Sequence, residues 1–165
     1  MPYERALETT DPRQQKTLSP GSPEEKAALE RVFDLFSELT EERIRSKVRD
    51  VYAAQAYFHD TLKEVHGVGA IEEYLVDSAR AVNHCTVRFT DVGRSEGEYY
   101  LRWEMEIEFK KLKRGQVCRS IGMTHMRFDE QGMVVLHQDY WDAASGVFEH
   151  VPLLGSMIRA IKNRL

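Results

Sequence analysis

The feature that most constrains the fold is a run of segments in which apolar and polar residues alternate. Three such segments follow one another, at residues 85–89, 101–109 and 122–128. Successive side chains of a strand point to opposite faces, so this alternation is typical of strands with one buried and one solvated face. In the middle segment, Trp103 and Met105 are expected on the buried face. Three one-sided strands in succession predict an antiparallel sheet.

A turn and a fourth strand extend this run. Residues 129–132 read Asp-Glu-Gln-Gly, and Asp in the first place with Gly in the fourth is the preference of a type I turn. Residues 133–142 are then predicted as the last strand. Its alternation puts four residues on one face, namely Val135, His137, Asp139 and Trp141. That face combines a histidine and an aspartate with apolar side chains.

Helical spacing precedes the strands. Residues 22–25 supply an N-cap serine, a proline at the first helical position and a glutamate three residues after the cap. A helix is predicted to begin there, a second and shorter one after Thr40, and a third over residues 71–83, with a short strand within residues 50–60. Helices followed by a meander of strands predict an α+β fold in which one curved antiparallel sheet packs helices against one face. Such a sheet leaves a concave pocket, where a ligand is sought first.

The two ends of the chain are expected to differ from this central part. Residues 1–21 have no apolar period and are predicted to be a flexible leader, followed by a folded domain over residues 22–145. Residues 146–165 carry apolar residues on one helical face and basic residues off it, which predicts an amphipathic C-terminal helix. Packing at the open end of the domain or at a dimer interface is favoured over binding to a membrane surface.

Composition narrows the possible partners. The net charge of −4 offers no strong positive field to a nucleic acid. Cys85 and Cys118 lack the paired spacing of a zinc site, and the histidines form no metal-binding motif, so neither a metal nor another cofactor is expected. The N-terminus lacks the apolar run of a signal peptide and no segment reaches the roughly 20 apolar residues of a membrane span, which predicts a cytoplasmic protein.

The candidate catalytic residues are a histidine and two aspartates. His137 and Asp139 are costly to bury unless they are hydrogen-bonded or wetted, so they predict either a polar patch in a cavity or a pair that satisfies itself. Asp60 ends an apolar segment, where its carboxylate is placed either to act as a base at the mouth of the pocket or to cap a turn.

Several short motifs resemble those of bacterial ketosteroid isomerases. They are GQVC at residues 115–118, MRFDEQG at 126–132 and YW at 140–141. The order of elements over about residues 24–142 is similar to the nuclear transport factor 2-like superfamily, a cone-shaped α+β (cystatin-like) fold that includes SnoaL-like polyketide cyclases. The sequences HQDYWD at 137–142 and FEHVPLLG at 148–155 look most like uncharacterised SnoaL-like bacterial proteins. The resemblance implies a curved antiparallel sheet wrapped around the N-terminal helices.

The resemblance also assigns roles to single positions. The proton-shuttling aspartate of the isomerases falls on Asp60, whereas their oxyanion-hole aspartate and tyrosine fall on Thr124 and near Phe36. Loss of both acidic donors removes the stabilisation of a dienolate, so steroid isomerisation of the familiar kind is not expected. His137 and Asp139 instead give the pocket a different set of polar groups.

We therefore expect a small, largely apolar organic ligand with a carbonyl, epoxide or hydroxyl group. Asp60 or the His137 and Asp139 pair would act as acid or base in an isomerase, cyclase, dehydratase or epoxide hydrolase. The expected ligand-binding residues are Tyr57, Trp103, Met105, Thr124, Met126 and Trp141. The alternative is a non-catalytic ligand-binding or assembly module. A homodimer through the outer face of the sheet is expected in either case, because the glutamates of residues 104–108 read as a solvated or subunit-facing surface.

Overall fold

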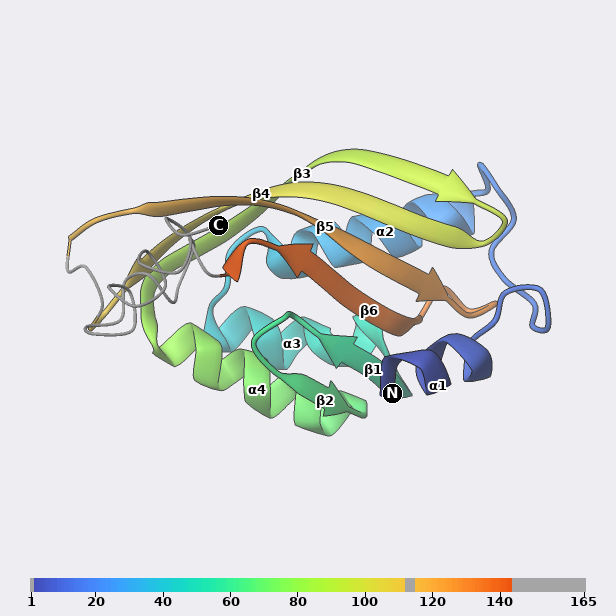
Figure 1. The fold of residues 1–165 in the computed structure, drawn as a ribbon, viewed down its shortest axis with the longest axis horizontal. Helices are drawn as coiled ribbons and strands as arrows, with labels where there is room; N and C mark the ends of the chain where they lie inside the picture. The colour runs from blue at the N-terminus through green and yellow to red at the C-terminus, as the bar shows by residue number, and fades with distance from the viewer. Residues whose placement is uncertain (1, 112–114, 144–165) are drawn as a thin grey trace, which may run out of the picture.

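The computed structural model describes residues 2–111 and 115–143 and has a six-stranded curved sheet wrapped around helices (Figure 1). The described helices are α1 (Pro2–Thr9), α2 (Pro23–Phe36), α3 (Glu41–Val51) and α4 (Val68–Arg80). The strands are β1 (Tyr52–His59), β2 (Glu64–His66), β3 (Val82–Ser95), β4 (Glu98–Phe109), β5 (Cys118–Phe128) and β6 (Val134–Trp141). The predicted α+β class is confirmed.

Both predicted helix starts are confirmed by their caps. The side chain of Ser22 accepts a hydrogen bond from the amide of Glu25 at the start of α2. Thr40 accepts one from the amide of Arg43 at the start of α3. These bonds satisfy amides that have no partner within the helix, so each helix begins where the local sequence supplies an acceptor.

The sheet has the order β2-β1-β6-β5-β4-β3, and most of its neighbouring strands are antiparallel. One pair departs from the antiparallel prediction, because β1 runs parallel to β6. This pairing joins strands from the two halves of the chain and places the end of β1, near Asp60, beside the end of β6. It therefore brings two distant candidate site residues, Asp60 and Asp139, to one region of the sheet.

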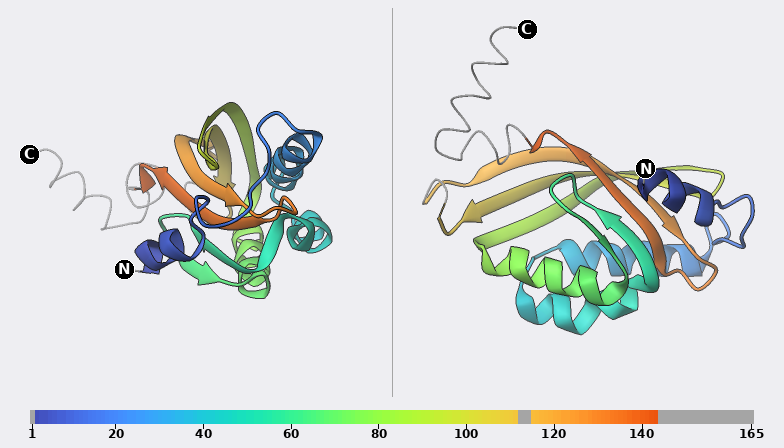
Figure 2. Two further views of the ribbon diagram at one scale, coloured as in Figure 1. Left: turned by 90° about the vertical axis from the view of Figure 1, so that its right-hand side faces the viewer. Right: turned by 60° about the horizontal axis from the view of Figure 1, so that its bottom comes forward.

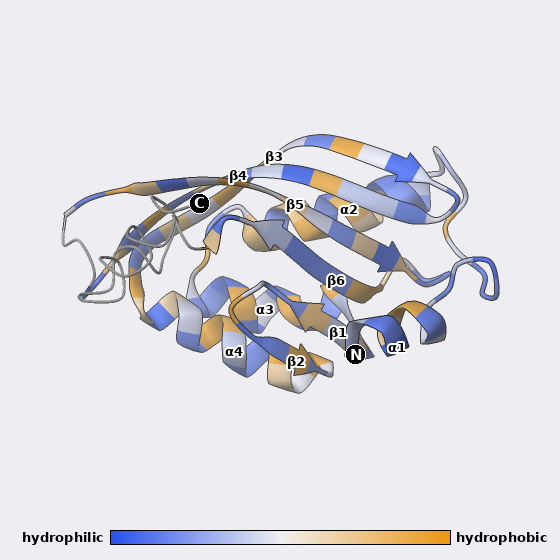
Figure 3. Ribbon diagram, in the orientation of Figure 1, coloured by the Kyte–Doolittle hydropathy of each residue, from blue (hydrophilic) through white to orange (hydrophobic). Residues whose placement is uncertain are grey.

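Helices α2, α3 and α4 cover the concave face of the sheet and bury its apolar side (Figure 2). Figure 3 shows the alternation of polar and apolar residues along β3 and β4 as bands of blue and orange. The central core contains Leu35, Ile44, Ile71, Leu101 and Met126, whose side chains are fully buried. One residue of β6 differs from prediction: a register shift leaves Val135 unpaired with β5, and Val134 enters the core in its place.

The prediction of a flexible leader is corrected by α1. This helix lies on the side of the sheet away from α2–α4 and packs Ala6 against Tyr57 and Leu136 (Figure 2). Farther along, Leu18 is 5% exposed and belongs to the central core. The apolar stripe of α1 is too short to show a period in the sequence, and its burial depends on a sheet face formed by residues far along the chain.

The predicted C-terminal helix at 146–165 lies outside the described residues. In the part of the chain that the structure describes, no helix has the length and apolar character needed to cross a membrane.

Candidate functional site

A cavity of about 260 Å³ lies on the concave side of the sheet, next to α4. Its walls come from all strands except β2, from α4 and from the end of α2. Most of the wall is apolar, with a few polar groups that converge on it. The volume is below the roughly 300–1,000 Å³ of sites for drug-sized molecules, so the cavity suits a compact ligand.

Most of the predicted site residues meet in this cavity. They are Asp60, Trp103, Met105, Thr124, His137, Asp139 and Trp141. Two predicted residues do not line it. Tyr57 points to the opposite face of the sheet, where it packs under α1, because neighbouring residues of a strand face opposite ways. Met126 is on the expected face but is 0% exposed within the core, deeper than the cavity.

Asp139 ends a chain of buried hydrogen bonds. Its Oδ1 atom lies 3.0 Å from Nε2 of His137 and accepts a hydrogen bond of 2.5 Å from the hydroxyl of Thr124. The indole nitrogen of Trp103 in turn donates to the Thr124 hydroxyl at 2.9 Å. On the far side of the imidazole, the Tyr52 hydroxyl lies 2.8 Å from Nδ1 of His137. Tyr52 was not predicted as a site residue, because only the fold places it against His137.

The directions of these bonds follow from Tyr52. Burial raises the pKa of Tyr52 well above its ordinary value, so the group remains a phenol. Nδ1 of His137 is the only hydrogen-bond partner of this hydroxyl among the described residues. A buried hydroxyl needs an acceptor for its proton, so Nδ1 accepts and Nε2 carries the proton that is donated to Asp139. The carboxylate of Asp139 is therefore the last acceptor of the chain, with His137 and Thr124 as its two direct donors.

The second carboxylate, Asp60, is held differently. Its Oδ1 atom accepts hydrogen bonds from the amides of Leu62 and Lys63, at 3.0 and 2.9 Å, and its Oδ2 atom accepts one of 2.5 Å from Tyr74. The indole of Trp141 donates to the Asp60 carbonyl at 2.8 Å. Both side-chain oxygens of Asp60 are thus occupied, and the turn-capping alternative describes its contacts.

Asp139 keeps a free oxygen. No described residue donates a hydrogen bond to its Oδ2 atom, and its side chain is 14% exposed, whereas that of His137 is 4% exposed. A general base must reach the proton that it removes, and of the two carboxylates Asp139 has the oxygen available to do so.

Two other ionisable side chains in the cavity wall, Cys85 and Tyr74, keep their protons at neutral pH. Burial raises the pKa of the Cys85 thiol to about 12, so this group stays protonated and is not a nucleophile at neutral pH. Burial and the neighbouring charge of Asp60 also raise the pKa of Tyr74, which keeps its proton. Tyr74 lies within the third predicted helix, and no local signal marks it as a site residue. The described residues contain no cluster suited to a metal ion.

Comparison with known proteins identifies relatives of this fold. The model of the SnoaL-like domain family matches residues 27–137. A search of curated proteins finds no match. An NTF2-like protein of unknown function from Exiguobacterium sp. 255-15 is 20% identical, with a TM-score of 0.60 over 70% of this chain and 98% of its own.

Two further solved structures carry names that imply chemistry. An LEH-like epoxide hydrolase of M. tuberculosis is 14% identical, with a TM-score of 0.62 over 86% of this chain and 96% of its own. A protein assigned as a SnoaL-like polyketide cyclase, from Jannaschia sp. CCS1, is 15% identical, with a TM-score of 0.59 over 79% of this chain and 99% of its own. At these identities the likeness shows the shared fold.

Proposed function

This chain belongs to the SnoaL-like domain family, and we propose that it binds a compact, largely apolar molecule in its cavity and exchanges a proton with it through Asp139. One observation carries this proposal. Oδ1 of Asp139 accepts hydrogen bonds from His137 and Thr124, whereas its Oδ2 has no described donor in a largely apolar cavity. The carboxylate is held in place on one side and available to a ligand on the other.

The arrangement suits reactions that begin with proton transfer. His137 and Thr124 orient the carboxylate, and Tyr52 and Trp103 orient those two residues in turn. A positioned base typically contributes about 10²–10⁴-fold to a rate. Isomerisation, cyclisation, dehydration and the opening of an epoxide by water all fit this machinery. Solved structures that share this fold are named as an epoxide hydrolase and a polyketide cyclase, which supports this range of reactions.

The two tryptophans of the chain provide a direct measurement of binding. Trp103 and Trp141 both line the cavity, and the chain contains no other tryptophan. Ligand entry is therefore expected to change their fluorescence, so that small epoxides and cyclic ketones can be ranked by titration. Turnover is then followed as hydrolysis of cyclohexene oxide and as deuterium exchange at the α-carbon of cyclohexanone.

The Asp139→Asn variant tests the role of the carboxylate. It keeps an oxygen that can accept hydrogen bonds but is a poor base, so turnover of the best substrate should fall about 10²–10⁴-fold. Asp77→Asn, which makes the same change at an exposed residue of α4, is the matched control. Unchanged turnover in Asp139→Asn would show that Asp139 is not the base.

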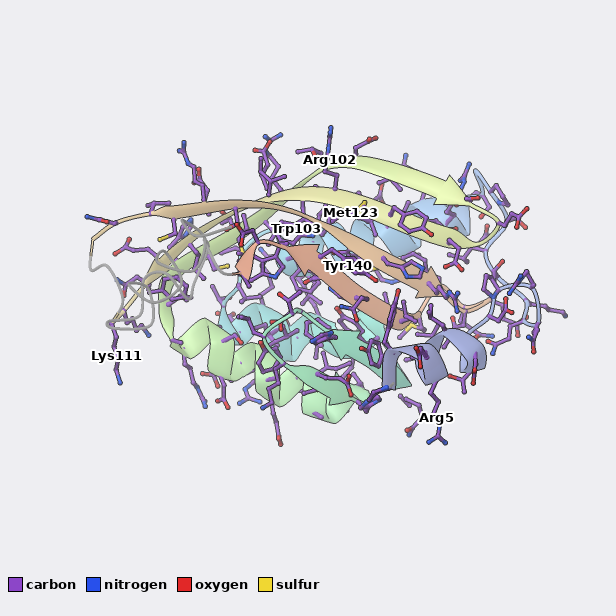
Figure 4. The ribbon with its side chains drawn as sticks, viewed as in Figure 1. Arg5, Arg102, Trp103, Lys111, Met123 and Tyr140 are labelled. Carbon is purple, nitrogen blue, oxygen red and sulfur yellow. The ribbon has the colours of Figure 1, made fainter. Side chains whose placement is uncertain are left out.

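A second candidate function, assembly of two copies, rests on the outer face of the sheet. Tyr100, Ile121, Met123 and Tyr140 are exposed there on neighbouring strands, and we call them the outer patch. Figure 4 labels Met123 and Tyr140 on this side, with Arg102 beside them on β4. Arg102 and Glu104 border the patch with opposite charges, which two copies related by a two-fold axis can match.

A further inference from the structure

The charges of the cavity point to the chemical class of its ligand. We infer that the bound molecule is an organic cation, a protonated amine or quaternary ammonium group on a compact apolar body. This inference rests on the proposed function, because it concerns the occupant of the same cavity. It is carried by the charges in the wall, by the aromatic rings around them and by the free oxygen of Asp139.

Two carboxylates line the cavity without a cationic partner. Asp60 and Asp139 are both in its wall, and none of the described lining residues is a lysine or an arginine. The imidazole of His137 bridges Tyr52 and Asp139 and takes its place in the wall as a hydrogen-bonding group. Lys63 lies 5.3 Å from the ring centroid of Tyr74, but none of the described ion pairs joins it to either carboxylate.

The most deeply buried carboxylates elsewhere in the described chain have a cationic partner. The buried Glu25 forms an ion pair with Arg94, and Glu98 forms one of 2.6 Å with Arg127. Asp11 is paired with Arg13 at 2.9 Å. Removing a carboxylate from water is costly unless an opposite charge compensates it. In the cavity, hydrogen bonds stabilise both carboxylates, and the opposite charge is left to the ligand.

Aromatic rings supply the rest of a cation site. Trp103 and Trp141 lie with ring centroids 6.3 Å apart and planes at 59°, so they form a corner in the wall. Phe58, Phe89 and Tyr74 add further rings. The electron-rich faces of such rings attract an ammonium group, most strongly where water is displaced. An anionic ligand would instead be repelled by both carboxylates, and a neutral ligand would leave them without a counter-charge.

The free oxygen favours a protonated amine over a quaternary ammonium ion. Oδ2 of Asp139 is an acceptor without a described donor, and an N–H group of the ligand can supply that hydrogen bond. A quaternary ammonium ion has no such proton and would be held by charge and by the rings alone. The apolar body of the ligand then packs against the aliphatic and aromatic wall.

Three probes of nearly equal size test the inference on the unmodified protein. Benzylamine is a cation at pH 7, benzyl alcohol is neutral and benzoate is an anion, and each is titrated against the tryptophan fluorescence. We expect benzylamine to bind about tenfold or more tightly than benzyl alcohol, as a desolvated cation–π and charge-assisted contact implies, and benzoate to bind most weakly. Asp139→Asn should reduce the preference for the amine, and Asp77→Asn, at an exposed residue of α4, should leave it unchanged.

The outcomes separate this inference from the proposed function. Equal binding of benzylamine and benzyl alcohol would overturn the inference and leave the cavity as a site for apolar molecules. Binding of none of the three probes would overturn both. A preference for the amine that persists in Asp139→Asn and in Asp60→Asn would also overturn it, because the charge would then be recognised elsewhere. The series on unmodified protein decides the question even if a variant fails to fold.

Discussion

At the scale of single residues, Gly122 determines where the Trp103 ring lies. The two residues are opposite each other on β5 and β4, and a β-carbon on Gly122 would lie 2.3 Å from Cζ2 of Trp103. The indole therefore occupies the space that a side chain at Gly122 would take. From that position its nitrogen reaches the hydroxyl of Thr124, which in turn donates to Asp139. A residue with no side chain thus supports the geometry of the site.

Replacing Gly122 by alanine is expected to displace the Trp103 ring. The added methyl group overlaps with ring atoms packed in a buried wall, so the free energy of unfolding should fall by about 1–3 kcal/mol, and the tryptophan fluorescence should change. Urea denaturation measures the first effect. Gly69→Ala is the matched control, because a β-carbon at Gly69 in α4 meets nothing within 4 Å and should be neutral or slightly stabilising. Equal stability of Gly122→Ala and the unmodified protein would contradict this account.

At the scale of elements, polar contacts join segments that the apolar pattern does not connect. Arg127 on β5 donates to the carbonyl of Leu7 at 2.7 Å and to the Thr10 hydroxyl at 3.0 Å, and so fixes the end of α1. The Tyr3 hydroxyl lies 2.8 Å from Nδ1 of His125. These bonds hold α1 on the outer face, next to the outer patch, and Arg5 points away from the sheet (Figure 4).

A second polar contact joins the start of α2 to the hairpin of β3 and β4. Glu25 accepts hydrogen bonds of 2.7 Å from the Tyr99 hydroxyl and from the Gly21 amide, and it also pairs with Arg94. Burial by itself would raise the pKa of Glu25, but the bonds from Tyr99, Arg94 and Gly21 outweigh burial and lower that pKa below its ordinary value.

This contact should make stability depend on pH. Because the pKa of Glu25 is lower in the folded state than in the unfolded state, its contribution is complete above an unfolded value of about 4.3 and is lost as pH falls through the folded value. The difference in unfolding free energy between the unmodified protein and Glu25→Gln should therefore be largest near pH 7 and shrink in acid. Urea denaturation from pH 3 to 7 measures it. Glu24→Gln, an exposed neighbour, is the control, and a pH-independent difference would refute the linkage.

At the scale of the whole molecule, the sheet has an apolar surface that no described element covers. In the outer patch, Ile121 is 69% exposed, Tyr140 46% and Met123 42%. Scattered apolar residues are common on surfaces, but adjacent ones on three strands are typical of an interface. The proposed partner is a second copy of the chain, placed with its outer patch against the first.

The oligomeric state follows from this proposal. The unmodified protein should have the mass of a dimer at micromolar concentration by light scattering after size-exclusion chromatography. Ile121→Asp should give the mass of a monomer, because it buries an unpaired charge at the interface. Leu62→Asp makes the same change at a residue that is 43% exposed in the turn between β1 and β2, and it should remain a dimer. A monomeric unmodified protein would exclude the proposed pairing.

Features that depend on near neighbours along the chain could be predicted from the sequence. Alternation in β4 and β5 requires only the geometry of a strand, and the caps at Ser22 and Thr40 reach only three residues forward. The alternation in β6 placed His137 and Asp139 together on the cavity side of that strand.

Features that depend on contacts between distant segments are seen only in the tertiary structure. The parallel pairing of β1 with β6, the docking of α1 and the inward position of Val134 arise from partners that no local pattern reveals. The tertiary structure also gives the two carboxylates different hydrogen-bond environments. Both oxygens of Asp60 are occupied by its own turn and by Tyr74, whereas Asp139 accepts hydrogen bonds at one oxygen and leaves the other available. The physical reason is that propensity and periodicity act over a few residues, whereas burial and hydrogen bonding act between whichever groups the fold brings into contact.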